Sequence, residues 1–352
     1  MIIISGGHGW SLQKTPGVGD CWRLSRAVDV RFSKSRALSD VRANARVPRP
    51  CCVRIGALVP SWAPSEGVSP AEPQSASDYD DRTTVAVKAV LIEVGQILGA
   101  FKGKFAVVGG AVPWLLLNNE DMPHVGTLDV DLGLNAEALG DGEYATLVKA
   151  LMSHGYEQRK ELRRFQLVRR VPTNAGGSID VIVDFLMPRD AEIMRNVPPL
   201  LSEFAVQRAD GAELALRFYQ MVEVVGHMPS GGVNRVEIAV CSIPALLAMK
   251  GHAVNGRYKQ KDSYDIYYCI RNYPDGIGRL AEVCRPLLEH ASAARGFGFV
   301  AEKFDRPDGY GPTCVRRFVE DTKMLGAHTP DQWQQDAFGQ VDAWVRALGL
   351  RG

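Results

Sequence analysis

The spacing of hydrophobic positions changes along the chain, and the change separates a mixed α/β part from a helical part. Residues 84–100 carry apolar side chains at helical spacing, which predicts a helix. Short apolar runs at 104–108 and 127–134 predict strands, with a helical pattern at 111–119 between them. A further helix is expected at about 136–153. This part of the sequence therefore predicts strands that alternate with helices.

Two hairpins and a run of helices are predicted in the rest of the chain. Residues 163–171 and 177–188 alternate as strands around the turn PTNAGG, and 213–225 and 233–241 surround the turn PSGG. Ser242 is a residue type that caps helices, so a helix is expected to follow it. Further helices are predicted at 261–272 and between about 276 and 349. No internal repeat interrupts this order.

The first 80 residues differ from the rest. They mix Arg, Ser, Pro and Gly with little periodicity, a composition that does not bury enough apolar surface to fold alone. We expect residues 1–80 to be a disordered tail, or an over-long start with the natural one nearer Asp78. The predicted class is α+β, with an α/β core at 81–241 and a helical domain at 242–352.

Composition narrows the class of protein. The formal net charge is +1, so a nucleic-acid surface would have to be a local patch. The seven cysteines show no CxxC pairs, which is typical of reduced thiols. No apolar run reaches the length of about 18 residues that predicts a membrane span. We therefore expect a soluble, cytoplasmic protein without a membrane partner.

The first candidate chemistry is an acidic pair in the predicted strand TLDVDLGL. Residues i and i+2 of a strand point to the same face, so Asp129 and Asp131 present their carboxylates side by side. Two such charges repel unless a cation lies between them, and Mg²⁺ prefers carboxylates together with phosphate oxygens. The alternative is a solvated strand edge.

A glycine pair precedes this strand. Gly109 and Gly110 follow the apolar run at 104–108 and precede the predicted helix at 111–119. Without Cβ atoms they let backbone N–H groups approach a phosphate, and the helix adds its positive N-terminal end. The alternative is an ordinary turn, but the order strand, glycine turn, helix and acidic strand favours a phosphate and metal site.

A third carboxylate is expected from the strand IDVIVDFL. Asp180 and Asp184 share one face of it, and acids in an apolar strand are costly without a partner. Two-metal phosphoryl transfer uses such an extra carboxylate as ligand and base. Asp184 is the preferred ligand and Asp180 the alternative. For Asp180 we favour an ion pair with one of the arginines of the hairpin, which are Arg163, Arg164, Arg169 and Arg170.

The segment KGHAVNGRYKQKDSYDIYY carries the second group of charges. Lys250 and Arg257 share a face if one helix continues between them, and so do Asp262 and Asp265. Lys acts on a triphosphate as a point charge and Arg grips it with two hydrogen bonds, while an Asp can orient either cation. The alternative is a surface helix with ordinary charge pairs.

Together these segments resemble the nucleotidyltransferases of the AbiEii/AbiGii toxin family, within the DNA polymerase β superfamily. The resemblance covers about 105–273 and rests on VVGGAVPWLLL, TLDVDL, VDFLMP and LLAMKGHAVNGRYKQKDSYDIY. It implies a polymerase-β-like core followed by helices. It also implies a Gly-Gly phosphate loop, three metal-binding acids, a phosphate-binding lysine and a final catalytic acid with a second acid beside it. In this chain these are Gly109, Gly110, Asp129, Asp131, Asp184, Lys250, Asp265 and Asp262.

The chain departs from the family pattern at three places. Ala111 stands where the loop often has Ser or Thr, which removes one hydroxyl contact to phosphate. The stretch before Asp129 is longer than usual, with NNEDMPHVG inserted. Gly126 stands where a basic residue often precedes the Thr, and the candidate substitute is His124 or a residue elsewhere in the chain.

The resemblance implies transfer of an NMP from an NTP with Mg²⁺ as cofactor. The acceptor would be a tRNA or a protein hydroxyl, in a toxin–antitoxin or phage-defence system with an antitoxin partner. Two alternatives are a nucleotidyltransferase acting on a small molecule and a catalytically inactive module that binds nucleotide or RNA. A basic cluster of the first hairpin could hold an RNA backbone or be a solvated face; it comprises Arg159, Lys160, Arg163, Arg164, Arg169 and Arg170.

Overall fold

The computed structural model describes the chain in two compact units, Met1–Trp62 and Ala63–Gly352. The described residues are 10–14, 22–26, 81–117, 119–135, 137–139, 142–173, 176–191 and 206–352. In the first unit, β1 (Trp10–Lys14) pairs antiparallel with β2 (Trp22–Arg26). These strands lie within the segment 1–80 that was predicted to lack structure, and the rest of that segment lies outside the described residues.

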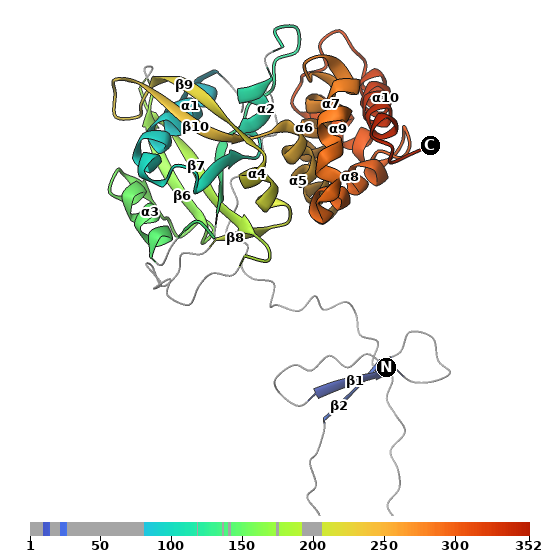
Figure 1. Cartoon of the computed structure of the whole chain (residues 1–352), viewed down its shortest axis with the longest axis horizontal. Coiled ribbons are helices and arrows are strands. Elements are labelled where there is room, and N and C mark those ends of the chain that lie inside the picture. The colour runs from blue at the N-terminus through green and yellow to red at the C-terminus, as the bar shows by residue number, and fades with distance from the viewer. Residues whose placement is uncertain are drawn as a thin grey trace, which may run out of the picture. The chain divides into compact units, whose positions relative to one another are not determined.

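The second unit contains a mixed eight-stranded sheet (Figure 1). Its strand order is β5-β6-β7-β4-β3-β10-β9, and β8 pairs with β7. β4 runs parallel to β7 and antiparallel to β3, and β3 runs parallel to β10. The bounds are β3 Phe105–Val108, β4 Asp129–Leu134, β5 Tyr156–Glu157, β6 Gln166–Pro172, β7 Ser178–Pro188, β8 Gln207–Ala209, β9 Tyr219–His227 and β10 Val233–Cys241.

The two predicted hairpins are β6–β7 and β9–β10, and both pair antiparallel. The prediction for the second hairpin was wrong at its start, because α4 (Ala212–Arg217) occupies the first residues of the expected strand 213–225. Its sequence AELALR consists of good helix formers, and Ala212, Leu214 and Ala215 are buried. α3 (Glu143–Met152) also begins later than expected, directly after Gly142 with its positive φ of 75°.

One face of the sheet is covered by α1 (Asp81–Ile97). Alternation of side chains places Val130 and Leu132 on that face, where both are fully buried. Together, α1 and the 3₁₀ turn η2 (Leu98–Phe101) include the stretch Arg82–Phe101. By length and composition alone, this stretch is long and apolar enough to cross a membrane. Over 18 residues of that stretch, 56% are buried inside the protein, as is typical of a core helix.

Helices follow β10 to the end of the chain, beside the sheet (Figure 1). As predicted, Ser242 caps the first of them by accepting a hydrogen bond from the Ala245 amide. Gly251 and Gly296 let two of them pack closely, since a Cβ on Gly251 would lie 1.9 Å from the Gly296 carbonyl oxygen. The bounds are α5 Ile243–Gly256, α6 Gln260–Arg271, α7 Gly276–Cys284, η3 Arg285–Glu289, α8 Ala291–Lys303, α9 Tyr310–Asp321 and α10 Pro330–Leu348.

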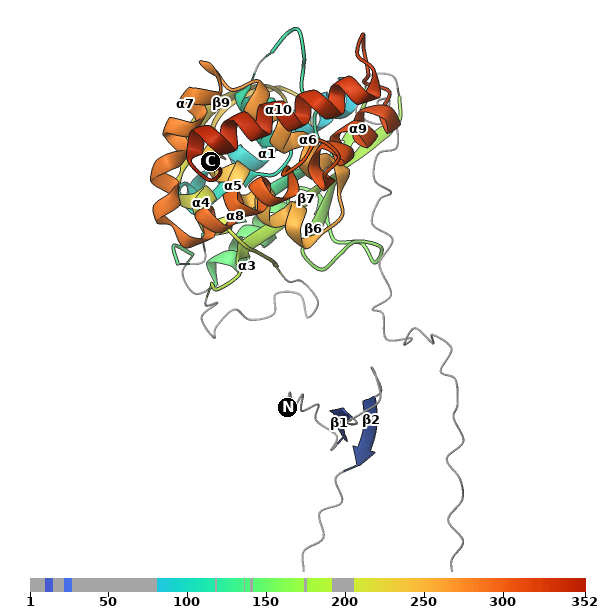
Figure 2. The ribbon, with the colours of Figure 1, turned by 90° about the vertical axis from the view of Figure 1, so that its right-hand side faces the viewer.

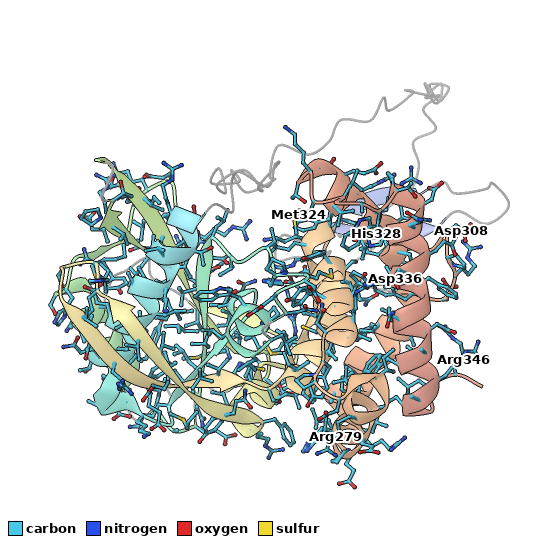
Figure 3. All side chains as sticks on the ribbon, turned by 90° about the horizontal axis from the view of Figure 1, so that it is seen from above. Arg279, Asp308, Met324, His328, Asp336 and Arg346 are labelled. Atoms are coloured by element: carbon cyan, nitrogen blue, oxygen red, sulfur yellow. The ribbon has the colours of Figure 1, made fainter. Side chains whose placement is uncertain are left out.

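The long helix α10 lies across the outside of the helical part (Figure 2). Asp336 of α10 faces α6 (Figure 3), where the Tyr267 hydroxyl donates to its carboxylate at 2.5 Å. Trp333 and Trp344 of the same helix are buried in the core. These contacts hold α6 in place, and α6 carries Asp262 and Asp265, two of the charged residues predicted for the site. The mixed sheet followed by helices confirms the predicted α+β class.

Candidate active site

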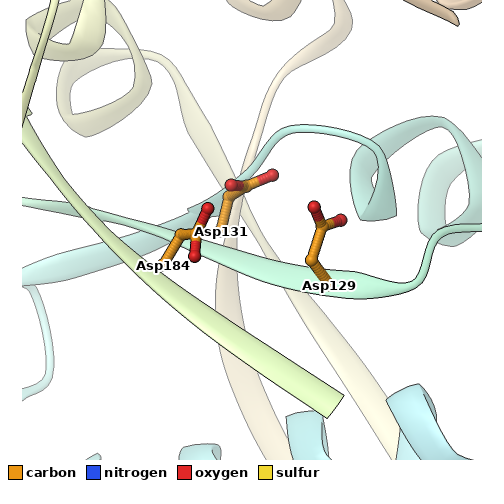
Figure 4. A group of neighbouring side chains, drawn as sticks. All are labelled: Asp129, Asp131 and Asp184. Carbon is orange, nitrogen blue, oxygen red and sulfur yellow. The ribbon is translucent and has the colours of Figure 1, made fainter. Parts of the chain in front are cut away.

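Strand register brings three aspartates together at one end of the sheet. Asp131 of β4 lies directly opposite Asp184 of the parallel neighbour β7, and Asp129 precedes Asp131 by two residues on the same face. One carboxylate oxygen of each lies within 4.8 Å of the others. Figure 4 shows the three side chains projecting to the same side of the two strands. The predicted third carboxylate therefore joins the predicted pair.

Burial and mutual repulsion disfavour the ionised forms of Asp131 and Asp184. Burial and repulsion by Asp129 raise the pKa of Asp184 to about 7, although a hydrogen bond from Gln166 lowers it. Burial and repulsion by Asp129 and Asp184 raise the pKa of Asp131 well above its usual range. The Oδ1 atom of Asp184 is buried without a hydrogen-bond partner among the described residues. A divalent cation would neutralise this charge, and its preference for carboxylate oxygens fits the residues present.

Asp180 lies outside this group. Its carboxylate accepts hydrogen bonds from Arg159 at 2.5 Å and from Arg170 at 3.0 Å. These two hydrogen bonds outweigh partial burial and lower the pKa of Asp180. The structure therefore separates the two aspartates of β7. Asp184 faces the other acids, whereas Asp180, the alternative metal ligand, pairs with Arg170 of the neighbouring strand β6 and with Arg159, which follows β5.

The glycine pair fits closely against the site. Gly109 has a φ of 70°, and a Cβ there would lie 1.8 Å from the Oδ2 atom of Asp131. A Cβ on Gly110 would lie 2.8 Å from the Thr127 hydroxyl and 2.9 Å from the Lys261 ammonium. The missing Cβ atoms thus leave room for an acid and a lysine of the site. The approach of a phosphate to these backbone amides stays a prediction, and the helix after them, α2 (Ala111–Leu116), is shorter than expected.

A buried network of cations and carboxylates lies next to the glycine pair. The Lys250 ammonium contacts Asp262 at 2.6 Å and Asp265 at 2.7 Å. The Arg257 guanidinium donates two hydrogen bonds to Asp262, at 2.7 and 3.0 Å. Lys261 contacts Asp265 at 2.9 Å. The four predicted charged residues therefore form one cluster, together with a second lysine that the sequence did not single out.

The charges of this network are fixed by mutual contact. Burial opposes ionisation of Asp262, but Lys250 and Arg257 lower its pKa to about 2. Burial also lowers the pKa of Lys250, yet Asp262 and Asp265 raise it overall. Lysine, arginine and both carboxylates are therefore charged at neutral pH, and the cations keep fixed positions.

Arg257 lies outside the helix that carries Lys250, although one continuous helix was expected. α5 ends at Gly256, and Arg257 has an extended backbone with φ −148° and ψ 161°. It therefore does not share a helix face with Lys250, as one continuous helix would have required. The chain turns at this point, and the turn brings both side chains to Asp262.

Lys261 and His124 are two buried residues of the site whose contacts with Asp265 the sequence did not predict. Lys261 precedes Asp262 in a charge-rich run, where its type alone carries no separate signal. His124 lies 3.1 Å from Asp265 through Nε2, while its Nδ1 accepts from the Gly126 amide. Burial lowers the pKa of His124 to about 4. The expectation that His124 supplies a missing positive charge is therefore wrong: it is a neutral donor that holds Asp265.

The basic cluster of the first hairpin divides into two groups. Arg159 and Arg170 pair with Asp180, and Arg169 pairs with Glu93 at 2.7 Å. The remaining members, Lys160, Arg163 and Arg164, are exposed. Of these three, Arg163 also lowers the pKa of Asp184.

Comparisons with known proteins give structural likenesses only. No protein-family model and no curated protein matches the chain. The structure is similar to an antigenic nucleotidyltransferase-like protein from Paracoccidioides brasiliensis, with 15% identity, 63% of this chain and 89% of that one covered, and a TM-score of 0.38. It is also similar to JHP933 from Helicobacter pylori, with 11% identity, 77% and 95% covered, and a TM-score of 0.40. At TM-scores this low, the two likenesses assign no activity to this chain.

Proposed function

We propose that this site transfers a nucleoside monophosphate from an NTP to an acceptor hydroxyl, with Mg²⁺ as cofactor. One observation carries the proposal. The three aspartates, whose negative charges lack a neutralising cation, lie on one side of the glycine pair, and the buried cationic network lies on the other. Lys250 and Arg257 both lower the pKa of Asp131, so the two halves are close enough to interact. A metal–triphosphate complex carries charges that match both halves.

The carboxylate half would hold the metal through Asp129, Asp131 and Asp184. Bound Mg²⁺ would neutralise these acids and the phosphate oxygens around the reacting phosphorus. Thr127 donates to Asp129 at 2.5 Å and fixes the orientation of that carboxylate. This carboxylate is therefore held in position before substrate binds, which favours catalysis.

The cationic half would bind the triphosphate. Lys250 is held by Asp262 and Asp265, and Arg257 is held by Asp262, so neither side chain has to be ordered when substrate arrives. Lys261, held by Asp265 against the glycine pair, adds a positive charge where the predicted phosphate loop lies. Asp262 and Asp265 thus act as positioning residues for the cations.

The chemical step would use Asp184 as the base. The acceptor oxygen attacks the α-phosphorus, the bond to the bridging oxygen of the β-phosphate breaks, and pyrophosphate leaves. The hydroxyl proton passes to a carboxylate oxygen of Asp184, whose Oδ1 has no hydrogen-bond partner among the described residues.

The acceptor we propose is a tRNA or a protein hydroxyl, which would make the chain a cytoplasmic toxin controlled by an antitoxin. The AbiEii/AbiGii-like motifs support this reading. The exposed cations Lys160, Arg163 and Arg164, of which Arg163 acts on Asp184, also support a polyanionic acceptor, since phosphates attract such a patch.

The test is incubation of the protein with each α-³²P-labelled NTP, Mg²⁺ and total RNA or lysate. We expect label in the RNA or protein fraction, and loss of at least about 100-fold in Asp129→Asn. The control is Asp180→Asn, which removes an aspartate of the same strand face outside the metal group and should keep the activity. Label in a small molecule would change the acceptor class, and no label with any NTP would refute nucleotidyl transfer.

A further inference from the structure

Residues 119–126, which we call the strap, lie along one face of α6 before the chain enters β4. The side-chain amide of Asn119 donates a hydrogen bond to the Oδ1 atom of Asn272 at 2.6 Å, at the end of α6. The Tyr268 hydroxyl donates to the Met122 carbonyl oxygen at 3.0 Å. Since Asn272 and Tyr268 are one helical turn apart, the strap follows the helix.

His124 is the residue of the strap that reaches the cationic network. Its side chain is fully buried, and its Nδ1 atom accepts a hydrogen bond from the Gly126 amide at 3.1 Å. Because a nitrogen that accepts carries no proton, the ring is neutral and its proton lies on Nε2. Nε2 therefore donates to the Oδ1 atom of Asp265 at 3.1 Å. Asp265 lies three residues before Tyr268, on the face of α6 that the strap covers.

Asp265 holds two lysines of the network at once. Its Oδ1 atom lies 2.9 Å from the Lys261 ammonium, and its Oδ2 atom lies 2.7 Å from the Lys250 ammonium. These cations already balance the carboxylate, and the neutral His124 adds no charge to it. The hydrogen bond from His124 instead fixes the direction of the carboxylate, and the positions of both lysines depend on that direction.

The same histidine is tied to the start of the acidic strand. The amide that binds its Nδ1 atom belongs to the residue before Thr127, whose hydroxyl donates to Asp129 at 2.5 Å. A Cβ on Gly110 would lie 2.8 Å from the Thr127 hydroxyl and 2.9 Å from the Lys261 ammonium. His124 thus connects the two sides that meet at the glycine pair.

We propose that the strap positions the cations that bind the triphosphate, with His124 as the positioning residue, an inference that rests on the proposed function. His124 acts through Asp265 and not on the substrate. Loss of its hydrogen bond leaves the Asp265 carboxylate free to turn, and Lys250 and Lys261 move with it. Binding of the triphosphate then has to order these side chains, which costs affinity.

The ring of His124 also packs against two tyrosines of α6. Its centroid lies 4.7 Å from that of Tyr268 and 5.8 Å from that of Tyr264. Such ring contacts stabilise the fold whether or not Nε2 donates a hydrogen bond. A test of the positioning role must therefore separate the ring contacts from the hydrogen bond to Asp265.

The variants His124→Asn and His124→Gln make this separation, because both replace the ring by an amide. The amide nitrogen of glutamine is as many bonds from the backbone as Nε2, so His124→Gln keeps the donor to Asp265. Asparagine is one methylene shorter, so its amide oxygen takes the place of Nδ1 and His124→Asn keeps only the bond from Gly126. The control Tyr268→Phe removes a different hydrogen bond between the strap and α6.

The experiment measures equilibrium binding of inorganic triphosphate to the full chain in the presence of Mg²⁺, together with unfolding in urea. We expect His124→Asn to bind triphosphate about tenfold or more weakly, as for the loss of a hydrogen bond to a charged group. His124→Gln and Tyr268→Phe should bind it as the wild type does. All three variants should unfold at lower urea concentrations, because each loses a contact between the strap and α6.

Triphosphate binding by His124→Asn equal to that of the wild type would overturn the inference, since His124 would then serve the fold alone. Equal weakening in His124→Gln or in Tyr268→Phe would also overturn it, because the loss would follow the packing of the strap and not the bond to Asp265. In both cases nucleotidyl transfer by the wild type would leave the proposed function intact. A wild-type chain that binds no triphosphate with Mg²⁺ would refute the proposed function and the inference together.

Discussion

Replacement of Gly109 by alanine tests the arrangement of the site most directly. The new Cβ would lie 1.8 Å from the Oδ2 atom of Asp131 and 2.7 Å from its Cγ atom. Real Cβ contacts are essentially never shorter than 3.0 Å, so the carboxylate must move by about 1.2 Å or the glycine turn must open. Either change moves the Asp131 carboxylate away from Asp129 and Asp184, with which it would hold the metal.

Two separate costs follow from this geometry. Alanine at a φ of 70° costs about 1–2 kcal/mol of folding free energy, because its Cβ crowds the backbone in the left-handed region. The displaced carboxylate adds a functional loss, since a misplacement of about 1 Å can reduce catalysis about 100-fold. We therefore expect lower stability together with nearly complete loss of nucleotidyl transfer.

Gly103→Ala is the matched control. Gly103 has a φ of 81°, and a Cβ there would meet nothing within 4 Å. This variant should lose the same backbone free energy of about 1–2 kcal/mol while keeping its activity. Urea unfolding measures the first effect and incorporation of labelled nucleotide the second. If Gly109→Ala is as active as Gly103→Ala, the close contact between the glycine turn and Asp131 is not what positions the metal group.

Three further predictions concern single side chains. Lys250→Met should lower the free energy of unfolding by about 3–5 kcal/mol in urea titrations, because two buried carboxylates lose their shared cation; a loss below about 1 kcal/mol would contradict the network. Asp184 has a raised pKa of about 7, so its ionisation makes the wild type less stable as the pH rises from about 4 to 7. In EDTA at about pH 8, Asp184→Asn should therefore have a higher free energy of unfolding than the wild type, by up to about 4 kcal/mol. Addition of Mg²⁺ should raise the free energy of unfolding less in this variant than in the wild type. Equal stabilisation of both by Mg²⁺ would argue against Asp184 as a ligand. His124 has a lowered pKa of about 4, so it contributes stability above its unfolded pKa that is lost as the pH falls from 6.5 to about 4. His124→Gln should flatten this part of the pH profile of unfolding, and an unchanged slope would show that His124 is not buried in its neutral form.

Local periodicity determined much of the fold. Alternation predicted both hairpins and the acidic strand, and Ser242 marked the start of α5. Within one strand, the spacing of Asp129 and Asp131 alone placed them on one face. The failure at 213–218 has a local cause as well, since AELALR favours a helix by composition although it precedes a strand.

Contacts between distant segments required the tertiary structure. Asp180 and Asp184 are equivalent in the periodicity of β7, and only the register with β4 and β6 places Asp184 opposite Asp131 and Asp180 beside arginines. Asp265 and His124 lie 141 positions apart, so no local pattern predicts their hydrogen bond.

The sequence by itself therefore predicted most of the candidate site residues, because residue type and strand or helix period act over a few neighbouring positions. Only the tertiary structure decided which of them meet. Pairing depends on the register of neighbouring strands and on where a helix stops, as the end of α5 before Arg257 shows. The same dependence determines charge: burial and the partners it brings together make His124 neutral and keep Lys250 charged.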